Sequence, residues 1–417
     1  MARKKNRRGR YEIQEKKASE RKYTSYEDVP LEDYRSTEPE PSNITGKFLK
    51  VFLILFLSVV AVLAFMNIDK LTPDNIAHWF QYDLLGKTDG EGYPITFTGA
   101  SLNTQNFDLI SNVPVYCSDT TIAVLNPNAG KYQENQHSYA SPALSVNGGY
   151  AIVYNIDATG FTVLKRDSVV YSGSADDKIY AGDIADNGVY ALLTRSDDYL
   201  SKLTVYRTDN LEKYEYSFAD YYVNTVSLNH DGSRAVLSGV SARNGGLISV
   251  IYILDFTQDT YMQKYEADDT YIYEVSFLNN GNAVAVGDKT AFFINVESGQ
   301  KKDFSFKSRT LTNYTLKRDF GMLLSLSVNP DGRECNIITV SNSGEIAENI
   351  HTGEKILSMD INNGRAAVLE HGKLVVFAAD GKEETSVEVS FDARKLRYTD
   401  HRTFYVLGKS RIFKIGI

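Results

Sequence analysis

Apolar and polar positions alternate in short runs along most of the chain. From about Tyr93 onward, segments rich in Val, Ile, Leu, Tyr and Phe are separated by turns that contain Gly, Asn or Asp. An alternating pattern places every second side chain on the same face of a strand, and no long stretch of this part shows a helical period. The sequence therefore predicts an all-β domain over residues 93–417.

A phrase of strand, tight turn and strand recurs along this domain. Asn-Gly and Asp-Gly pairs in its turns supply the positive φ that a tight hairpin needs. A second hairpin follows each phrase, as in FFINVESGQKKDFSF, so that a repeat of about 42 residues contains four strands. The aligned turn glycines, 39 to 49 residues apart, are Gly149, Gly188, Gly232, Gly281, Gly321 and Gly364.

Four antiparallel strands per repeat are typical of a β-propeller blade. The predicted units are 108–138, 143–178, 180–220, 222–268, 271–307, 312–350 and 356–390, followed by a tail, 396–417, with room for only three strands. The strand YPITFTG at 93–99 supplies the fourth, because such closure removes an exposed sheet edge. We predict a propeller of eight blades, with seven as the alternative.

A continuous apolar run precedes this domain. From Val51 to Met66 there is no charged residue, and Ser58 is the only polar one. With residues 48–50 the run spans about 28 Å as a helix, close to the thickness of a hydrocarbon core. A cleaved signal peptide is disfavoured because about 47 residues precede the run. The sequence predicts a transmembrane signal-anchor helix over 47–66.

The charges that flank this run predict its orientation. Lys47 and Lys50 adjoin it, and six Lys or Arg lie within the first ten residues. The positive-inside rule then places the N-terminus in the cytoplasm and the domain outside a cell membrane that the chain crosses once. Residues 1–46 are predicted to be a disordered basic cytoplasmic tail. Residues 67–92 are predicted to form a juxtamembrane helix, 73–85, and a hinge.

The charge balance differs on the two sides of the predicted span. The net charge is −8, yet residues 1–50 carry 13 basic and 9 acidic side chains, whereas 32 basic and 44 acidic ones follow. An acidic domain excludes nucleic acid as its partner, because phosphate binding needs positive charge. Cys117 and Cys335 are the only cysteines, and we expect them to be unpaired because a domain of this size is stable without a disulfide.

Several phrases resemble the DUF5711 family. They are LTPDNIAHWF after the predicted span, then YPITFTG, SDTTIAVLNPNAGK and QHSYASPALSVNGGYAIVYN. The resemblance covers the chain from about Lys47 to its C-terminus. It implies a single-span membrane protein of Gram-positive anaerobes with a propeller-like ectodomain, and it implies no chemistry.

The sequence contains no catalytic, cofactor-binding or metal-binding signature. H-E-x-x-H, G-x-S-x-G, C-x-x-C and a Walker-type loop do not occur, and the six histidines lack ligand spacing. Carboxylates of predicted innermost strands, Asp183, Glu274 and Asp360, are interpreted as solvated lining of a central tunnel. Tyrosines near the predicted blade starts are candidates for an aromatic ligand surface; those chosen are Tyr180, Tyr222, Tyr273 and Tyr314.

These observations favour a non-enzymatic binding or scaffold module that recognises protein or envelope glycan outside the cell. The insertion SGVSARNGGLIS at 238–249 is predicted to project from the ring and contact a partner. Two alternatives stay open. One is a hydrolase or lyase of envelope glycan that uses Asp183 and Glu274 for acid–base chemistry. The other is a transmembrane sensor that signals through residues 1–46.

Overall fold

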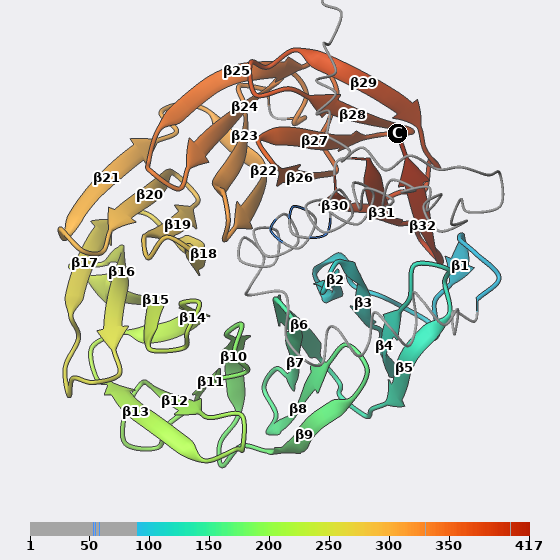
Figure 1. Ribbon diagram of the computed structural model, residues 1–417. Helices are drawn as coiled ribbons and strands as arrows, with labels where there is room; N and C mark the ends of the chain where they lie inside the picture. The colour runs from blue at the N-terminus through green and yellow to red at the C-terminus, as the bar shows by residue number, and fades with distance from the viewer. Residues whose placement is uncertain (1–52, 54, 56–57, 59–89, 330, 401) are drawn as a thin grey trace, which may run out of the picture. The chain divides into compact units, whose positions relative to one another are not determined.

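The computed structural model describes residues 53, 55, 58, 90–329, 331–400 and 402–417 (Figure 1). The chain divides into two units, Met1–Leu84 and Leu85–Ile417. Within the second unit, eight four-stranded antiparallel sheets form a closed ring of propeller blades. The prediction of eight blades is confirmed, and the alternative of seven is wrong.

The first four blades follow one another along the chain, each from its innermost to its outermost strand. A short 3-10 helix, η3 (Thr104–Asn106), precedes blade 1. Blade 1 contains β2 (Phe107–Ile110), β3 (Val113–Cys117), β4 (Thr121–Leu125) and β5 (Lys131–Gln136). Blade 2 contains β6 (Pro142–Asn147), β7 (Tyr150–Asn155), β8 (Gly160–Lys165) and β9 (Val169–Ser174). Blade 3 contains β10 (Ile179–Ile184), β11 (Tyr190–Thr194), β12 (Ser201–Tyr206) and β13 (Glu212–Phe218). Blade 4 contains β14 (Tyr222–Leu228), β15 (Arg234–Arg243), β16 (Gly246–Asp255) and β17 (Gln263–Asp268).

The last four blades complete the ring. Blade 5 contains β18 (Ile272–Phe277), β19 (Ala283–Gly287), β20 (Thr290–Asn295) and β21 (Gln300–Ser305). Blade 6 contains β22 (Thr310–Lys317), β23 (Gly321–Ser327), β24 (Cys335–Ser341) and β25 (Ile346–Thr352). Blade 7 contains β26 (Ser358–Asn362), β27 (Arg365–Glu370), β28 (Lys373–Phe377) and β29 (Glu383–Glu388). Blade 8 contains β30 (Lys395–Asp400), β31 (Thr403–Leu407), β32 (Arg411–Gly416) and the N-terminal strand β1 (Ile95–Thr96).

Blade 8 closes the ring with strands from both ends of the domain. Ile95 and Thr96 of β1 pair with Ile412 and Arg411 of β32. The predicted closure by residues 93–99 is therefore confirmed, although only two of those residues are in a strand. The pairing joins the first and last strands of the ring and completes the four strands of the last blade.

Apolar side chains pack between neighbouring blades rather than in one central core. Eight clusters of buried residues occur among the described residues, and each joins one adjacent pair of blades. The second strands β3, β11 and β19 are buried at every position because a blade covers each of their faces. The outermost strands β5 and β29 alternate between exposed and half-buried positions. This packing leaves the outermost strands as the ones that face solvent.

Turn glycines allow the tight connections between innermost and second strands. Gly188, Gly232, Gly281 and Gly364 have φ between 62° and 84°, as the repeat predicts. In blade 2 the positive φ lies at Gly148 (54°) and not at the aligned Gly149. Asn147 pairs with Tyr150 there, so the turn has two residues, and its residue with positive φ comes one position before the aligned glycine.

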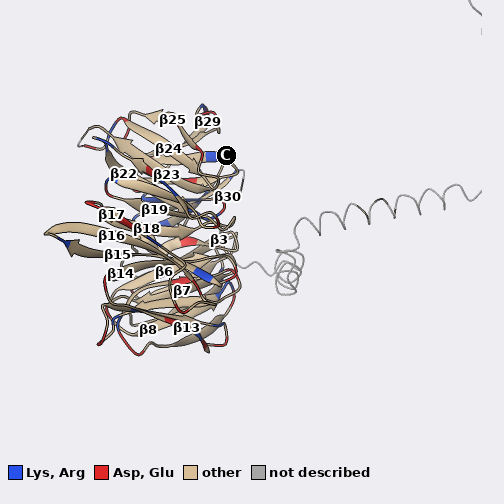
Figure 2. Cartoon of the chain, turned by 90° about the vertical axis from the view of Figure 1, so that its left-hand side faces the viewer, with Lys and Arg blue, Asp and Glu red and all other residues tan. Residues whose placement is uncertain are grey.

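The ring has two distinct faces. Each blade alternates strand direction, so all innermost strands begin on one face and end on the other. The hairpin face, where they begin, contains the Asn244–Gly245 turn of the long β15–β16 hairpin. The terminal face, where they end, contains the C-terminus and the contact of the Gly92 N–H with the Asn128 carbonyl oxygen, at 3.0 Å. Figure 2 shows the hairpin extending from the ring on the side away from the C-terminus.

The predicted segments before the ring fall outside the described residues. This applies to the tail 1–46, the helix 73–85, most of the hinge, and the span 47–66 except for Leu53, Leu55 and Ser58. In the described part of the chain, no helix has the length and hydropathy needed to cross a bilayer. The membrane span stays a prediction.

Candidate functional site

One polar side chain occupies the same position of the innermost strand in every blade. This polar collar links neighbouring blades around the ring axis. Its members, from blade 1 to blade 8, are Asp108, Ser145, Asp183, Ser227, Ser276, Thr315, Asp360 and Arg397.

Collar side chains bond to the adjacent blade in a repeated manner. Ser227 Oγ accepts a hydrogen bond from the backbone N–H of Phe277, at 3.1 Å, in the next blade. Thr315 Oγ1 donates to the Met359 carbonyl oxygen of the next blade, at 2.7 Å. Such bonds satisfy polar groups that burial would otherwise leave unpaired, so the collar has a structural role.

Asp183 is the most heavily bonded member of the collar. Its carboxylate accepts from Ser145 Oγ at 2.6 Å and from the Leu228 N–H at 2.7 Å. The third partner is Arg318, whose Nη2 lies 2.6 Å from Asp183 Oδ2. Arg318 also donates to the Leu228 carbonyl oxygen. Because Arg318 follows the last residue of β22, its side chain crosses the ring near the terminal face, from blade 6 to blades 3 and 4.

Two further ion pairs lie near the ring axis. Lys317 Nζ lies 3.0 and 3.3 Å from the two carboxylate oxygens of Asp360, which is fully buried. Arg397 binds Asp108 with two bonds, Nε to Oδ1 at 2.8 Å and Nη2 to Oδ2 at 2.9 Å. Asp360 and Asp108 are therefore engaged in charge-assisted bonds between blades.

Glu274 differs from these carboxylates because no ion pair to it occurs among the described residues. The side chain of Glu274 is exposed to solvent, but it projects from the innermost strand β18 and has protein on most sides. Burial raises the pKa of Glu274, while the nearby hydroxyl group of Tyr314 opposes that rise. The ring of Tyr314 stacks on Tyr273 with centroids 6.4 Å apart and planes 9° apart.

Lys395 is the basic counterpart of Glu274. No ion pair or hydrogen bond of its ammonium group is found within the described ranges. The positive charge of Arg397, and then burial, lower the pKa of Lys395 to about 8. Glu274 and Lys395 interact electrostatically with each other, although they come from blades 5 and 8.

Strand irregularities occur next to these groups. The pairing register of β14, β18 and β22 shifts between Val223 and Thr225, between Ile272 and Glu274, and between Leu311 and Asn313. Bulges of this kind redirect side chains and are frequent beside functional sites.

Asn224 lies within the bulge of β14. Its Nδ2 donates to the hydroxyl group of Tyr271 at 2.9 Å, while its Oδ1 is buried and has no hydrogen-bond partner among the described residues.

The predicted tyrosines lie in different environments. Tyr222 and Tyr273, near the starts of their strands, are 56% and 45% exposed on the hairpin face. Tyr180 and Tyr314 are half-buried, and only Tyr314 contacts a predicted carboxylate, Glu274. Tyr398, another tyrosine near a blade start, is buried against Phe404. The structure brings together Glu274, Tyr273 and Tyr314 but places Asp183 in a separate ion pair.

Exposed apolar side chains gather on the hairpin face. Seven of the eleven large exposed hydrophobic residues in the described ring lie there, and four lie on the terminal face. The predicted projection at 238–249 is confirmed as the outer part of β15–β16, with Arg243 paired to Glu266 at 2.6 Å. The seven residues are Ile156, Tyr199, Tyr222, Leu247, Tyr273, Val328 and Phe391.

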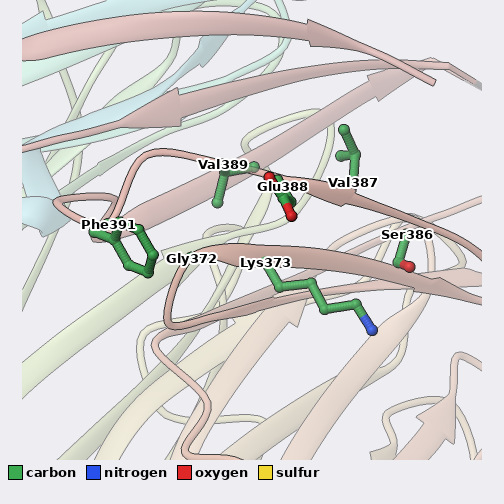
Figure 3. A pocket seen from close by; sticks show the side chains of 7 residues that line it. All are labelled: Gly372, Lys373, Ser386, Val387, Glu388, Val389 and Phe391. Carbon is green, nitrogen blue, oxygen red and sulfur yellow. The ribbon is translucent and has the colours of Figure 1, made fainter.

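A pocket of about 410 Å³ lies on blade 7, away from the collar (Figure 3). Phe391, 73% exposed, forms one end of it, and Lys373, which pairs with Glu383 at 3.6 Å, forms another part of its wall. The pocket has no paired carboxylates of the kind that acid–base chemistry uses. Its lining residues are Gly372, Lys373, Ser386, Val387, Glu388, Val389 and Phe391.

The cysteines are structural. Cys117 and Cys335 are both buried and free, as expected. Cys117 Sγ lies 3.3 Å from His137 Nε2, but burial raises the pKa of the thiol to about 12. A thiol in this state is a poor nucleophile. Among the described residues, no group of three or more His, Cys, Asp or Glu is placed to hold a metal ion.

Sequence reasoning missed the basic half of the ring centre. Lys317, Arg318, Lys395 and Arg397 were not among the predicted site residues, although each lies in or directly after an innermost strand. When the repeats are aligned on Asp183 and Asp360, Arg397 takes the equivalent position of the innermost strand in blade 8. This equivalence is the sequence signal that could have identified Arg397. Arg318 gives no such signal, because its partners come from blades far away in sequence.

Several solved structures resemble this ring. The C-terminal WD40 domain of Sif2 has a TM-score of 0.54 at 10% identity, covering 79% of this chain and 99% of that one. The computationally designed Ika8 protein has a TM-score of 0.53 at 12% identity, covering 77% and 98%. BamB from Moraxella catarrhalis has a TM-score of 0.50 at 10% identity, covering 78% and 100%. At such identities the likeness shows the fold alone.

Sequence comparison identifies the family but no characterised relative. No curated protein matches the chain. A model of a family of unknown function matches residues 96–417, which is the ring and not the predicted span or tail. The closed ring and this match together show that the chain belongs to the DUF5711 family.

Proposed function

We propose that this protein is a membrane-anchored extracytoplasmic propeller that binds a partner protein through its hairpin face. The observation that carries the proposal is the unequal distribution of exposed apolar residues, seven on the hairpin face against four on the other. Exposed apolar groups concentrated on one face are typical of interaction sites.

The point where the chain enters the ring is consistent with a binding site on the hairpin face. Gly92 contacts Asn128 on the terminal face, so the chain arrives on the side opposite to the hairpin. An anchor at 47–66 would then be joined to the ring through its terminal face. The hairpin face, with Tyr222 and the β15–β16 tip, lies on the side of the ring away from this entry point and is free to contact a partner.

The charged ring centre favours binding over glycan hydrolysis. A two-carboxylate mechanism needs an acid and a second free carboxylate. Glu274 has the raised pKa of a general acid, but Asp183, Asp360 and Asp108 are each held in an ion pair. Turnover of cell-wall material that disappears in Asp183→Asn with Glu274→Gln, while the fold is retained, would support the hydrolase instead.

Site-specific photocrosslinking in cells tests the binding face. A photoreactive residue at Asn244 or Tyr222 is expected to capture one discrete protein, whereas the same group at Leu211 or Ile346, exposed on the terminal face, is expected to capture none. Leu247→Asp should abolish capture from Asn244, and Leu211→Asp should leave it unchanged. Capture from the terminal face alone, or of glycan only, contradicts the proposal.

Protease treatment of intact protoplasts tests the topology. The ring is expected to be cleaved from outside, most readily at the exposed Asn244–Gly245 turn, while the N-terminal tail stays protected. A ring that is protected until the membrane is broken would refute the orientation.

A further inference from the structure

The charges at the ring centre do not all pair. Among the described residues, four acidic and four basic side chains from innermost strands and their ends lie there, and three pairs form between them. One acid and one base are left, Glu274 and Lys395. The three pairs are Asp108 with Arg397, Asp183 with Arg318, and Asp360 with Lys317.

Glu274 and Lys395 lie at the same level of the ring. Glu274 comes two residues before the collar residue Ser276, and Lys395 comes two residues before Arg397. Side chains two residues apart project from the same side of a strand. Because innermost strands begin at the hairpin face, both groups lie between the collar and that face. Their charges interact with each other and with that of Asp108.

A ligand does not reach Glu274 and Lys395 equally from the two faces of the ring. Arg318 crosses the ring near the terminal face and is bonded to Asp183 and to the Leu228 carbonyl oxygen. Tyr273, 45% exposed, lies next to Glu274 on the hairpin face. A ligand therefore reaches Glu274 from the hairpin face.

The two free groups have neighbours that suit opposite charges. The Tyr314 hydroxyl lies near Glu274, and the ring of Tyr314 stacks on that of Tyr273. A carboxylate beside tyrosine rings suits an ammonium group, through charge and cation–π attraction. Lys395 lies beside Arg397, and two neighbouring cations suit a carboxylate.

We propose that the hairpin-face side of the ring centre binds a small zwitterion, an amino acid or short peptide, whose ammonium group contacts Glu274 and whose carboxylate contacts Lys395. Such a ligand compensates both free charges at once. A simple anion or cation compensates only one of them and leaves the other charge without a partner. This site goes beyond the proposed partner binding, because it lies at the axis and not at the projecting hairpin.

Calorimetric titration of the full-length protein tests the proposal. Glycine, glycylglycine and triglycine vary the separation of the two charges, and one of them is expected to bind most tightly. The N-acetyl and C-terminal amide derivatives of that compound should each bind about tenfold more weakly or worse. If no member of the series binds, or if acetate binds as tightly as the best member, the proposal is wrong.

Variants assign the two ends of the ligand. Glu274→Gln should bind the free and the N-acetylated compound with equal affinity, and Lys395→Met should no longer distinguish the free compound from its amide. Matched controls on exposed positions, Glu297→Gln and Lys355→Met, should bind as the wild type does. Unchanged selectivity in both site variants overturns the assignment.

One variant separates this proposal from the proposed function. Leu247→Asp, which should abolish capture of a partner protein, should leave zwitterion binding intact, because Leu247 lies near the hairpin tip. If the site variants do not fold, the derivatives tested on the wild-type protein still decide the proposal, since they need no substitution.

Discussion

Arg318 and Asp183 are 135 positions apart in sequence, yet Arg318 Nη2 lies 2.6 Å from Asp183 Oδ2. The pair links blade 6 to blade 3 across the ring, whereas the other collar contacts join adjacent blades. Their side chains are only 18% and 6% exposed, so solvent screens the attraction weakly. The ring is thus held at its centre as well as at its closure.

Loss of this link should destabilise the whole ring. Arg318→Met leaves Asp183 buried without its cation, and we expect the free energy of unfolding to fall by about 3–5 kcal/mol. Chemical denaturation of the purified protein measures the change. Asp183→Asn combined with Arg318→Met should recover part of the loss, because the buried charge is then removed as well.

An exposed ion pair provides the control. Arg333 lies 4.0 Å from Asp331, with side chains 65% and 62% exposed. Arg333→Met should change the free energy of unfolding by less than about 1 kcal/mol. An Arg318→Met protein as stable as Arg333→Met would show that the cross-ring link contributes nothing.

Two turn glycines allow backbone strain to be separated from steric contact. Gly188 and Gly281 have φ of +83° and +84°, but a Cβ at Gly188 would lie 2.7 Å from the ring of Tyr150, and one at Gly281 meets nothing within 4 Å. Gly281→Ala should cost about 1–2 kcal/mol from strain alone. Gly188→Ala should cost more, and thermal unfolding of the two variants measures the difference. Equal costs would mean that Tyr150 moves away freely.

Much of the fold was predictable because a propeller repeats. The period of about 42 residues and the Asn-Gly and Asp-Gly turns indicated four strands per blade, and the short tail indicated closure by residues near Tyr93. The Gly149 prediction was wrong by one residue. Gly148 and Gly149 are adjacent, and the sequence does not show which of them the two-residue turn places at positive φ.

The candidate site was predictable only in part. Glu274 was selected as a carboxylate of a predicted innermost strand and Tyr314 as a tyrosine near a blade start, and the structure places the two close together. Asp183 was also selected as an innermost-strand carboxylate, but it forms an ion pair with Arg318, a partner that no local pattern reveals. Lys395 was missed because a lysine at the start of a strand is normally solvated, and only ring closure places it beside Arg397.

Asp360 should make the ring sensitive to acid. Burial by itself raises the pKa of Asp360, but the charges of Lys317 and Arg397 and the Tyr398 N–H outweigh it, so the pKa lies below its usual range. Its contribution is therefore present above the ordinary carboxyl pKa of about 4 and is lost as pH falls through the folded value. Asp360→Asn should lose about 3–5 kcal/mol at pH 7 and progressively less below about pH 4.

Denaturation curves across this pH range test the Asp360 prediction. The control is Asp197→Asn, since Asp197 is 86% exposed and lies 3.7 Å from Arg195. This variant should follow the wild type at every pH. A destabilisation by Asp360→Asn that is constant with pH would rule out a charge effect.

The buried cysteines should be unreactive in the folded protein. Cys117 has a pKa raised to about 12 by burial, and Cys335 is also completely buried. Iodoacetamide at pH 8 should leave both thiols unmodified for hours and should modify both in denaturant, because the thiolate is the reactive form. Mass spectrometry counts the adducts. Rapid modification of Cys117 under native conditions would show that it is accessible and has a lower pKa.

The charge of Lys395 should lower the free energy of unfolding of the ring. Arg397 and burial lower its pKa to about 8, so at pH 7 the charge of Lys395 is less favourable in the folded protein than in the unfolded chain. Lys395→Met should therefore stabilise the protein by about 1–3 kcal/mol at pH 7. As pH rises from about 8 toward the ordinary lysine value, the folded wild type loses this proton before the unfolded chain does, and its stability approaches that of the variant. Asp108, Asp360 and Glu274 also face Lys395, and their charges oppose the lowering of its pKa. Denaturation at pH 7 and pH 10 measures the convergence, and a Lys395→Met protein less stable at pH 7 would mean that Lys395 has a structural partner and is not free for a ligand.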